Sequence, residues 1–356
     1  MFEIIISIIV ISLLIIFHEL GHHLSAKKFG VKVEEFGLGL PPRLYGKKIG
    51  ETIWSLNWIP FGGFVRMQGM GEEEREKVDQ KRSFNTKPVW QRMLIVAAGC
   101  LVFWLLAVSI FFFIFVAGTS VTIDDYKIEP NAIVKIVEVG EESPAQLAGV
   151  EAGDIIEEIH INKEYAKINK IADVQNIFQR NPGGTAIIYI RRSNDLLTKK
   201  IILDDQDSKI GVALIRIVPN KSFSISEAIL MSLEKTYNST ILITQGLFGV
   251  IDNLIIGEEV VDIAGPVRIV GIMGGTLEFG VTHFLSFVAL ISINLAILNL
   301  LPIPGFDGGR LMFLIYEGIR KKPFPQKIEN YATGFFLILL MSLMLIVTIG
   351  EIRAML

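Results

Sequence analysis

Four long apolar segments divide the chain, and they lie at about residues 4–26, 93–117, 284–303 and 331–350. The second and the fourth contain no charged residue, and the polar residues of the third are only serines and asparagines. An α-helix of ~20 residues rises ~30 Å, the thickness of the hydrocarbon core of a bilayer. The pattern therefore predicts an α-helical integral membrane protein with about four transmembrane helices.

The stretches between these segments supply the remaining parts of the predicted protein. In chain order we expect a first transmembrane helix over 1–26, a cytoplasmic-side region with a hairpin over 27–92, a second transmembrane helix over 93–117, an extracytoplasmic domain over 118–222, an amphipathic membrane-surface segment over 223–283, a third transmembrane helix over 284–303, a motif with a cytoplasmic loop over 304–330, and a fourth transmembrane helix with the C-terminus over 331–356.

The charges of two loops predict the orientation. Residues 27–92 hold 13 Lys/Arg against 8 Asp/Glu, and residues 310–330 hold five against two. With four spans these two loops lie on the same side of the membrane, and basic loops favour the cytoplasmic side. Both termini are then expected on the outer side.

The region 27–92 has an unusual composition for a cytoplasmic loop. Phe36–Pro42 and Ile53–Val65 are rich in glycine, aromatic and β-forming residues. Backbone that is not helical is tolerated at membrane depth where protein buries it. We expect a β-hairpin that dips into the protein interior, and a plain amphipathic surface loop is the alternative. The charged stretch Glu72–Lys81 is expected to be solvated.

The outer region alternates short apolar runs with turns, which is typical of a small αβ domain. The expected strands are Ala132–Val139, Asp154–Ile161, Thr185–Arg191 and Thr198–Leu203, and the expected helices lie near Ser143 and over Ala172–Arg180.

A fifth apolar stretch, around Ile225–Ile251, is apolar on one side only and carries Glu227, Glu234 and Lys235. An amphipathic helix on the membrane surface is therefore a better interpretation than a span.

Composition agrees with a membrane protein that carries a polar insert. The chain has 356 residues, of which 51% are hydrophobic and 20% charged, and its mean hydropathy is +0.50. A net charge of −3 gives no reason to expect nucleic-acid binding. The single cysteine, Cys100, excludes an intrachain disulfide. The first apolar segment lacks a basic start and a small-residue cleavage site, so we expect it to be retained.

The sequence His18-Glu19-Leu20-Gly21-His22 lies inside the first apolar segment. Residues four apart share one face of a helix, so His18 and His22 can bind one metal ion, and Glu19 lies beside that face. This spacing is the helix motif of zinc peptidases. The alternatives are a chance match or buried histidines paired with backbone. We assign no metal role to His23.

A two-histidine site needs a third protein ligand if a fourth position is to stay open for water. The best candidate is Asp307, which follows the third apolar segment in a stretch with two prolines and three glycines. The alternative is that Asp307 is an N-cap for a helix that starts at Gly309. His160 and His283 are poorer candidates because both are expected on the outer side.

Five segments together carry a resemblance to a known family. They are His18–His22, Pro60–Met67, Ser143–Ile156, Ala264–Ile269 and Asn299–Gly309. Their types and order resemble the site-2 protease family, and in particular its bacterial RseP-type zinc metalloproteases. The resemblance covers nearly the whole chain.

The resemblance implies a Zn²⁺ ion bound by His18, His22 and Asp307, with Glu19 as the catalytic acid and base. It implies that the outer region is a circularly permuted PDZ-like domain, present here in a single copy. It also implies a multi-pass protein of the bacterial inner membrane, with its active-site motifs near the cytoplasmic side and the PDZ-like domain outside.

The same resemblance implies which residues contact the substrate. A membrane-reentrant β-hairpin that includes Gly62, Gly63 and Phe64 would pair with an unwound substrate segment, and Asn299 would hold the substrate backbone.

The chain departs from the family pattern at four places, none of which is a proposed zinc ligand. Cys100 stands where proline is usual and Phe103 where asparagine is usual. Arg310 stands in place of histidine, and Gly305-Phe306 in place of a small residue and leucine. Contacts between the second span and the site are therefore expected to differ from those of other members.

The predicted function is a zinc-dependent intramembrane endopeptidase that cleaves single-span membrane proteins, such as anti-sigma factors or remnant signal peptides, in regulated intramembrane proteolysis. The expected partners are these substrates and the lipid bilayer, and the expected state is a monomer. One alternative is a catalytically silent membrane scaffold that binds peptides through its PDZ-like domain. A zinc transporter would need polar residues along several spans, and the second and fourth spans lack them.

Overall fold

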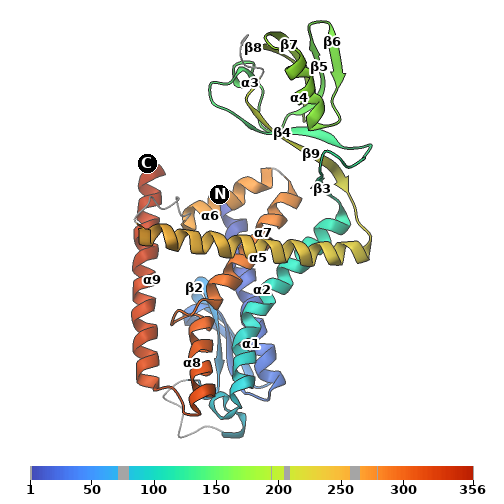
Figure 1. Cartoon of the computed structure of the whole chain (residues 1–356). Helices are drawn as coiled ribbons and strands as arrows, with labels where there is room; N and C mark the ends of the chain where they lie inside the picture. Colours follow the sequence, from blue (N-terminus) through green and yellow to red (C-terminus); the bar gives the residue numbers. More distant parts are fainter. Residues whose placement is uncertain are drawn as a thin grey trace. The chain divides into compact units, whose positions relative to one another are not determined.

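The computed structural model describes residues 2–70, 80–193, 195–203, 209–256, 265–278 and 280–355. It separates into two compact units (Figure 1). The first comprises Met1–Ile114 and Ile225–Leu356, and the second comprises Phe115–Ser224. The second unit is therefore inserted into the sequence of the first. Ala264, part of one segment that resembles the family, lies outside the described residues.

Four helices of the described residues are long and apolar enough to cross a bilayer. They are α1 (Phe2–Lys28), α2 (Val89–Ala117), α7 (Val281–Leu300) and α9 (Gln326–Met355). Each matches one of the four predicted spans, so the prediction of a multi-pass membrane protein is confirmed at the level of helix length and composition.

The region after α1 forms a sheet rather than a simple hairpin. β1 (Val33–Ile49) and β2 (Thr52–Met67) each reverse direction near their middle. Residues 35–38 pair with 63–66 on one side and with 53–56 on the other, while 43–49 pair with 52–57. The result is four segments in the order 63–67, 33–38, 52–57 and 43–49, in which the two outer pairs are antiparallel and the central pair, 33–38 with 52–57, is parallel. In the described part of the chain, 63–67 pairs on one side only and so forms an edge.

Two apolar clusters hold the first unit together. One joins the end of α1 to the sheet, α2 and α8 (Asp307–Arg320), and its buried members include Ala26, Met67, Ile95 and Leu314. The other joins α1, α2, α7 and α6 (Pro266–Glu278) through residues that include Phe103. α1, the helix that carries His18 and His22, is thus packed against other elements from one end to the other.

The predicted surface segment 223–283 contains two helices, α5 (Ile225–Ile256) and α6. The buried face of α5 consists of small side chains, Ala228, Ser232, Thr236 and Ser239, while bulky residues such as Leu230 and Phe248 are exposed. In Figure 1, α5 runs across the direction of α9. Small residues let the α5 backbone approach α7 closely and leave the large apolar side chains pointing outward.

The predicted loop 304–330 also contains a helix, α8. Its sequence places Leu311, Phe313 and Leu314 toward the core and Arg320 in the last turn, a pattern typical of an amphipathic helix. The short length of this helix makes it easy to mistake for a loop between two spans.

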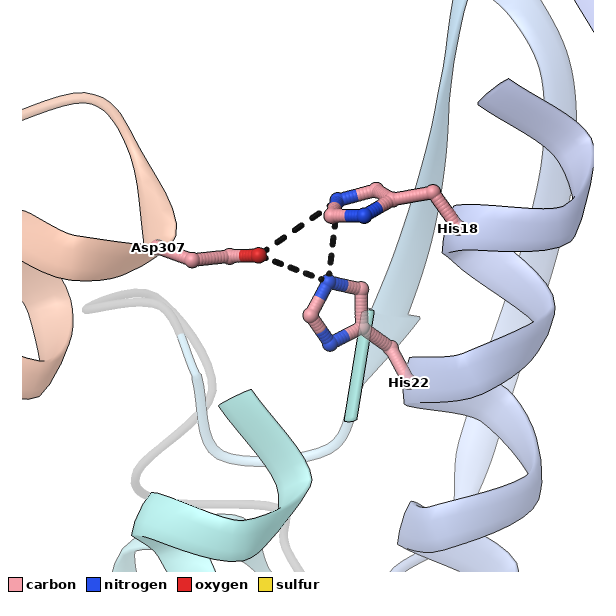
Figure 2. Close-up of side chains that lie close together, drawn as sticks. All are labelled: His18, His22 and Asp307. Carbon is pink, nitrogen blue, oxygen red and sulfur yellow. Dashed lines mark hydrogen bonds and ion pairs between the residues drawn. The ribbon is translucent and has the colours of Figure 1, made fainter. Parts of the chain in front are cut away.

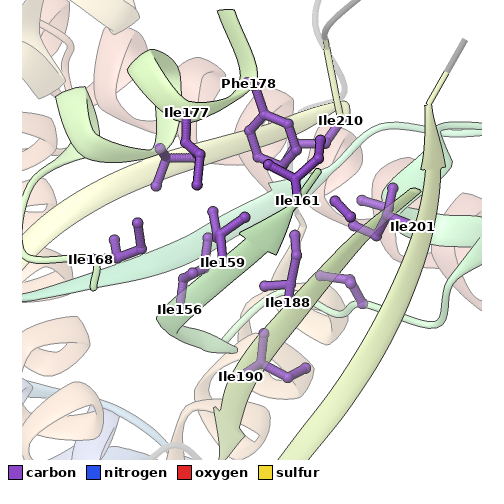
Figure 3. Packing of buried hydrophobic residues seen from close by; sticks show 14 of the residues in the cluster. Ile156, Ile159, Ile161, Ile168, Ile177, Phe178, Ile188, Ile190, Ile201 and Ile210 are labelled. Carbon is purple, nitrogen blue, oxygen red and sulfur yellow. The ribbon is translucent and has the colours of Figure 1, made fainter. Parts of the chain in front are cut away.

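The second unit is a sheet with two helices. Its elements are β3 (Thr119–Thr122), β4 (Ile133–Val139), α3 (Pro144–Leu147), β5 (Ile155–Ile161), β6 (Glu164–Lys167), α4 (Ile171–Arg180), β7 (Gly184–Arg192), β8 (Asp195–Leu203) and β9 (Val212–Lys221). The strand order is β3-β9-β4-β5-β7-β8, with β6 beside β5. The four strands and two helices expected in this region are all present. The core consists mainly of isoleucines from the sheet and α4 (Figure 3).

A buried ion pair supports the turn that leads into β5. Asp154 is 1% exposed and receives two hydrogen bonds from Arg192, at 2.8 and 2.9 Å. The backbone N–H of Glu151 donates to the same carboxylate at 2.9 Å. Asp154 therefore joins the Gly149–Gly153 turn to the end of β7.

Candidate metal centre

His18 and His22 point from one face of α1 toward the same spot, as the four-residue spacing predicts (Figure 2). Their Nε2 atoms are 3.2 Å apart and their rings meet edge to face. Both residues are largely buried, at 9% and 7% exposed. Two imidazole nitrogens that face each other so closely need a cation or a proton between them.

Asp307 reaches this spot from the far end of the chain. α7 ends at Leu300, a short break follows, and α8 begins at Asp307 itself. The N-cap of α8 is Phe306, so Asp307 is not the N-cap of a helix that starts at Gly309. Its Oδ2 atom lies 3.4 Å from Nε2 of His18 and 3.2 Å from Nε2 of His22.

Glycines make the tight turn before α8 possible. A Cβ at Gly308 would overlap the carbonyl oxygens of Leu300 and Leu301, and one at Gly309 would overlap that of Ile303. The two glycines therefore let α8 start directly against the break that follows α7. This close packing holds Asp307 at the level of the histidines.

The three donor atoms fit a zinc ion. Zinc in a tetrahedral site binds imidazole nitrogen and carboxylate oxygen at ~2.0–2.2 Å, which puts neighbouring donors ~3.3 Å apart. The three separations in this cluster are 3.2, 3.2 and 3.4 Å. His18, His22 and Asp307 are also a group of described residues whose ligand atoms all lie within 4.8 Å of one another. The donor set and its spacing are those of a three-ligand site with one position left open.

α2 supports both histidines from behind. The Nδ1–H of His22 donates to the carbonyl oxygen of Ile95 at 2.9 Å, which leaves Nε2 of His22 free to bind a metal. The ring of His18 stacks on Phe103, with centroids 4.8 Å apart and an interplanar angle of 18°. α2 thereby fixes the orientation of each ring.

Two further residues of α2 contact the cluster, and sequence reasoning missed their roles. Gly99 passes directly against both imidazoles. The thiol of Cys100 donates to Oδ2 of Asp307 at 3.7 Å. Both lie in an uncharged run where composition gives no sign of chemistry. The departure of Cys100 and Phe103 from the family pattern was the one available signal, and both residues do contact the site.

Glu19 lies next to the edge of the sheet. A Cβ added at Gly63 would lie 3.1 Å from Cγ of Glu19 and 3.3 Å from Cγ2 of Ile15, so a larger residue at this position would crowd both side chains of α1. Gly62 precedes it with φ +88°, a conformation that glycine adopts without strain. The chain thus turns at Gly62 and then runs past Glu19.

The remaining candidates occupy different places. The ring of Phe64 packs over Gly37 of the neighbouring segment. Asn299 lies in the last turn of α7 and is partly buried. His23 packs edge-on against Phe36 and Trp54, and so joins α1 to the sheet rather than to the metal cluster. His160 belongs to the second unit, where it contacts Tyr165 and Tyr189.

Known proteins match the chain over almost its full length. Residues 6–343 match the family model described as Peptidase family M50. A protein of Clostridium perfringens named "Putative zinc metalloprotease" is 34% identical, and the match covers 98% of each chain. A protein of Rickettsia conorii with the same name is 32% identical over 99% of each chain. The "Regulator of sigma-W protease RasP" of Bacillus subtilis is 27% identical over 97% of each chain.

Proposed function

Because this chain belongs to peptidase family M50, and is therefore a zinc-dependent intramembrane protease, we propose that His18, His22 and Asp307 are its zinc ligands and that Glu19 is its catalytic acid and base. The observation that carries the assignment is the meeting of three donor atoms, 3.2–3.4 Å apart, from the two ends of the chain. Zinc bound there would leave one position for water and lower the pKa of that water toward ~7.

Glu19 moves the proton in this proposal. It follows the first ligand on α1, and its carboxylate accepts a proton from the attacking water and returns it to the nitrogen of the leaving peptide fragment. Because Gly63 has no side chain, the edge of the sheet can lie directly against Glu19 on one side. Asp307 and the two histidines stay in place because α2 and the α7–α8 turn support them.

The edge segment 63–67 presents the substrate in the same proposal. A transmembrane helix keeps its peptide carbonyls in internal hydrogen bonds, so it must unwind before water can attack. An unpaired strand edge offers replacement partners by strand addition. The segment pairs on one side only among the described residues, and it begins at Gly63, against Glu19. Gly62, Gly63, Phe64 and Asn299 are the residues we assign to substrate binding.

We assign the sheet and the metal centre to the cytoplasmic half of the membrane and the second unit to the outer side. The basic character of 27–92 and 310–330 supports this orientation. The sheet would then enter the membrane from the cytoplasmic side, and the exposed bulky face of α5 would contact lipid at the opposite surface.

The second unit is a PDZ-like domain in this proposal. Its seven strands and two helices support that assignment, together with the Ser143–Ile156 segment, which forms α3, a glycine turn and β5. It would read the outer part of the substrate, by size or by a free carboxyl terminus. We propose single-span membrane proteins, such as anti-sigma factors or remnant signal peptides, as substrates.

The test is Glu19→Gln in the full-length protein. The variant keeps the volume of the side chain and removes its ability to accept a proton. We expect it to bind zinc as the wild type does, and to lose cleavage of a single-span reporter by ~10²–10⁴-fold, the usual contribution of a general acid and base. Undiminished cleavage would refute the role of Glu19. His22→Ala, which removes a ligand, should lose both zinc and cleavage.

A further inference from the structure

A cavity of about 460 Å³ lies in the first unit, next to the metal centre but outside it. Its walls are the end of the sheet and the segment 80–92, one face of α8, and the turn into α9. Ligand sites in proteins have volumes of ~300–1,000 Å³, so the cavity is large enough for a ligand of several residues.

The cavity begins one helical turn from the proposed zinc ligand. Arg310, Phe313, Leu314 and Glu317 of α8 line it, and this is the helix face on which Asp307 also lies. The rise from residue 310 to residue 317 is ~10 Å, the length of about three residues of extended polypeptide. This face thus has the length that a few residues of a chain cleaved at the metal centre would need.

The charges of the cavity are compensated internally. Arg92 and Glu317 form a pair with two hydrogen bonds of 2.6 and 3.0 Å, and both are largely buried. Nε of Arg310 lies 3.9 Å from Oε1 of Glu329, which is too far for a hydrogen bond. With two guanidinium groups and two carboxylates the lining is neutral, and so it is poorly suited to a phosphate group or a nucleotide.

The long distance between Arg310 and Glu329 leaves both side chains able to form further hydrogen bonds. A guanidinium has five N–H donors, and Glu329 is the one ion-pair partner of the Arg310 side chain that the described residues provide. A peptide backbone needs both donors and acceptors, and an arginine beside a glutamate supplies both. Apolar walls at Phe84, Phe313 and Phe324 suit side chains of an extended peptide.

We propose that this cavity binds the substrate polypeptide on one side of the cleaved bond, over residues about two to five positions from that bond, as an extended segment. Arg310 donates to its backbone carbonyl groups, and Glu329 accepts from its N–H groups. The proposal rests on the proposed function, since it names where the substrate of that reaction continues.

The first experiment locates the substrate by photocrosslinking. Phe324→p-benzoylphenylalanine places a probe in the cavity wall, and Trp90→p-benzoylphenylalanine is the matched control, an exposed aromatic position nearby that does not line the cavity. Both are made in full-length Glu19→Gln protein that holds zinc and a single-span substrate. We expect crosslinks from position 324 that map to residues two to five positions from the cleaved bond, and none from position 90.

The second experiment measures kinetics. Arg310→Gln should raise KM for the substrate ~10-fold and change kcat less than ~3-fold, because one or two hydrogen bonds to substrate are lost and no proposed zinc ligand is replaced. Arg310→Lys should recover part of the affinity. Zinc content is measured in parallel and should not change.

Several results would overturn the inference. Crosslinks to lipid alone, or equal crosslinking from both positions, would each contradict substrate binding in the cavity. A fall in kcat with unchanged KM would also contradict it, and would indicate that the cavity conducts water to the site instead. If the wild type cleaves the substrate and this cleavage depends on Glu19, any of these results would refute the binding role of the cavity but not the proposed function. Absence of cleavage by the wild type would instead refute the proposed function.

Discussion

Gly99 of α2 lies directly against the imidazole of His22: a methyl group at Gly99 would overlap Nε2 of His22 and lie 2.6 Å from Cε1 of His18. The same helix pair is also tight at the residue before His22, where a Cβ at Gly21 would lie 2.6 Å from the carbonyl oxygen of Ala98. Small residues on both helices thus bring α1 and α2 into backbone contact at the proposed zinc site.

Gly99→Ala is expected to abolish zinc binding, because the added methyl group displaces both rings or separates the helices. A misplacement of ~1 Å costs ~10²-fold in catalysis, so cleavage should fall by at least ~100-fold. Zinc content by elemental analysis and cleavage of a single-span reporter provide the measurements. Gly334→Ala on α9, where no atom lies within 4 Å, is the control and should behave as the wild type. Normal zinc content in the Gly99 variant would contradict the packing described above.

Gly63→Val should reduce cleavage without reducing zinc binding. A Cβ at position 63 would lie 3.1 Å from Cγ of Glu19, 3.2 Å from the carbonyl oxygen of Gly37 and 3.3 Å from Cγ2 of Ile15, and no histidine atom is among these three nearest contacts. We expect zinc content to stay at the wild-type level while cleavage falls by ~10–100-fold, since the proton acceptor is displaced by about an ångström. Loss of zinc in this variant would show that the sheet also supports the ligands, and the assignment of Gly63 to Glu19 alone would be wrong.

Cys100→Ala removes the thiol that donates to Asp307. Groups that orient a metal ligand typically contribute 10–100-fold to metal affinity. Because Sγ of Cys100 is 3.7 Å from Oδ2 of Asp307, we expect a contribution near the lower limit of this range. Zinc should therefore bind ~10-fold more weakly, as measured by competition with a chelator. Cys100→Ser keeps a donor and should stay within ~3-fold of the wild type. Equal affinity for all three proteins would exclude a role for the thiol.

The stability of the second unit is expected to fall in acid through Asp154. Burial alone would raise the pKa of this carboxyl, but the hydrogen bonds from Arg192 and from the backbone of Glu151 hold its pKa below the ordinary value. A carboxyl with a lowered pKa in the folded state stabilises the fold above the unfolded pKa of ~3.9, and this contribution is lost as the pH falls through the lower folded value.

Hydrogen exchange of the β5 and β7 amides in the intact protein, corrected for the intrinsic pH dependence, measures this effect. Protection should be constant from pH 7 to ~5 and should decline below pH ~4. Asp154→Asn should already lose ~2 kcal/mol at pH 7 and show a flatter pH profile, because bonds to a charged acceptor are worth ~1.5–3 kcal/mol. An unchanged profile in the variant would assign the acid sensitivity to other groups.

Local sequence patterns predicted what depends on local geometry. Four apolar runs gave the four long helices, and the spacing of His18 and His22 gave their shared face. Asp307 could be proposed only from the span topology and the family resemblance, since no periodicity relates it to α1. The separations that make the cluster fit zinc needed the structure.

The elements that were not predicted depend on tertiary contacts. The glycine and aromatic content of 33–67 indicated strands, but the reversals within β1 and β2 that make four segments depend on pairing between residues far apart in the sequence. In the sequence, Gly99 is one of several small residues in an apolar helix. Its contact with His18 and His22 is visible only in the structure. A helix starting at Gly309 was expected only as an alternative, because the residues of α2 and of the sheet end that cover the amphipathic face of α8 lie far away in sequence.

The proposed zinc ligands come from α1 and from the start of α8, so almost the whole chain separates them. During synthesis the two histidines and Glu19 leave the ribosome early and remain without the carboxylate until the third span has been inserted. On this assignment the nascent protein is an inactive precursor as it passes through the membrane-insertion machinery, and it becomes able to hydrolyse peptides only near the completion of translation. A truncated product that ends before residue 307 would likewise be harmless to the other proteins of its membrane.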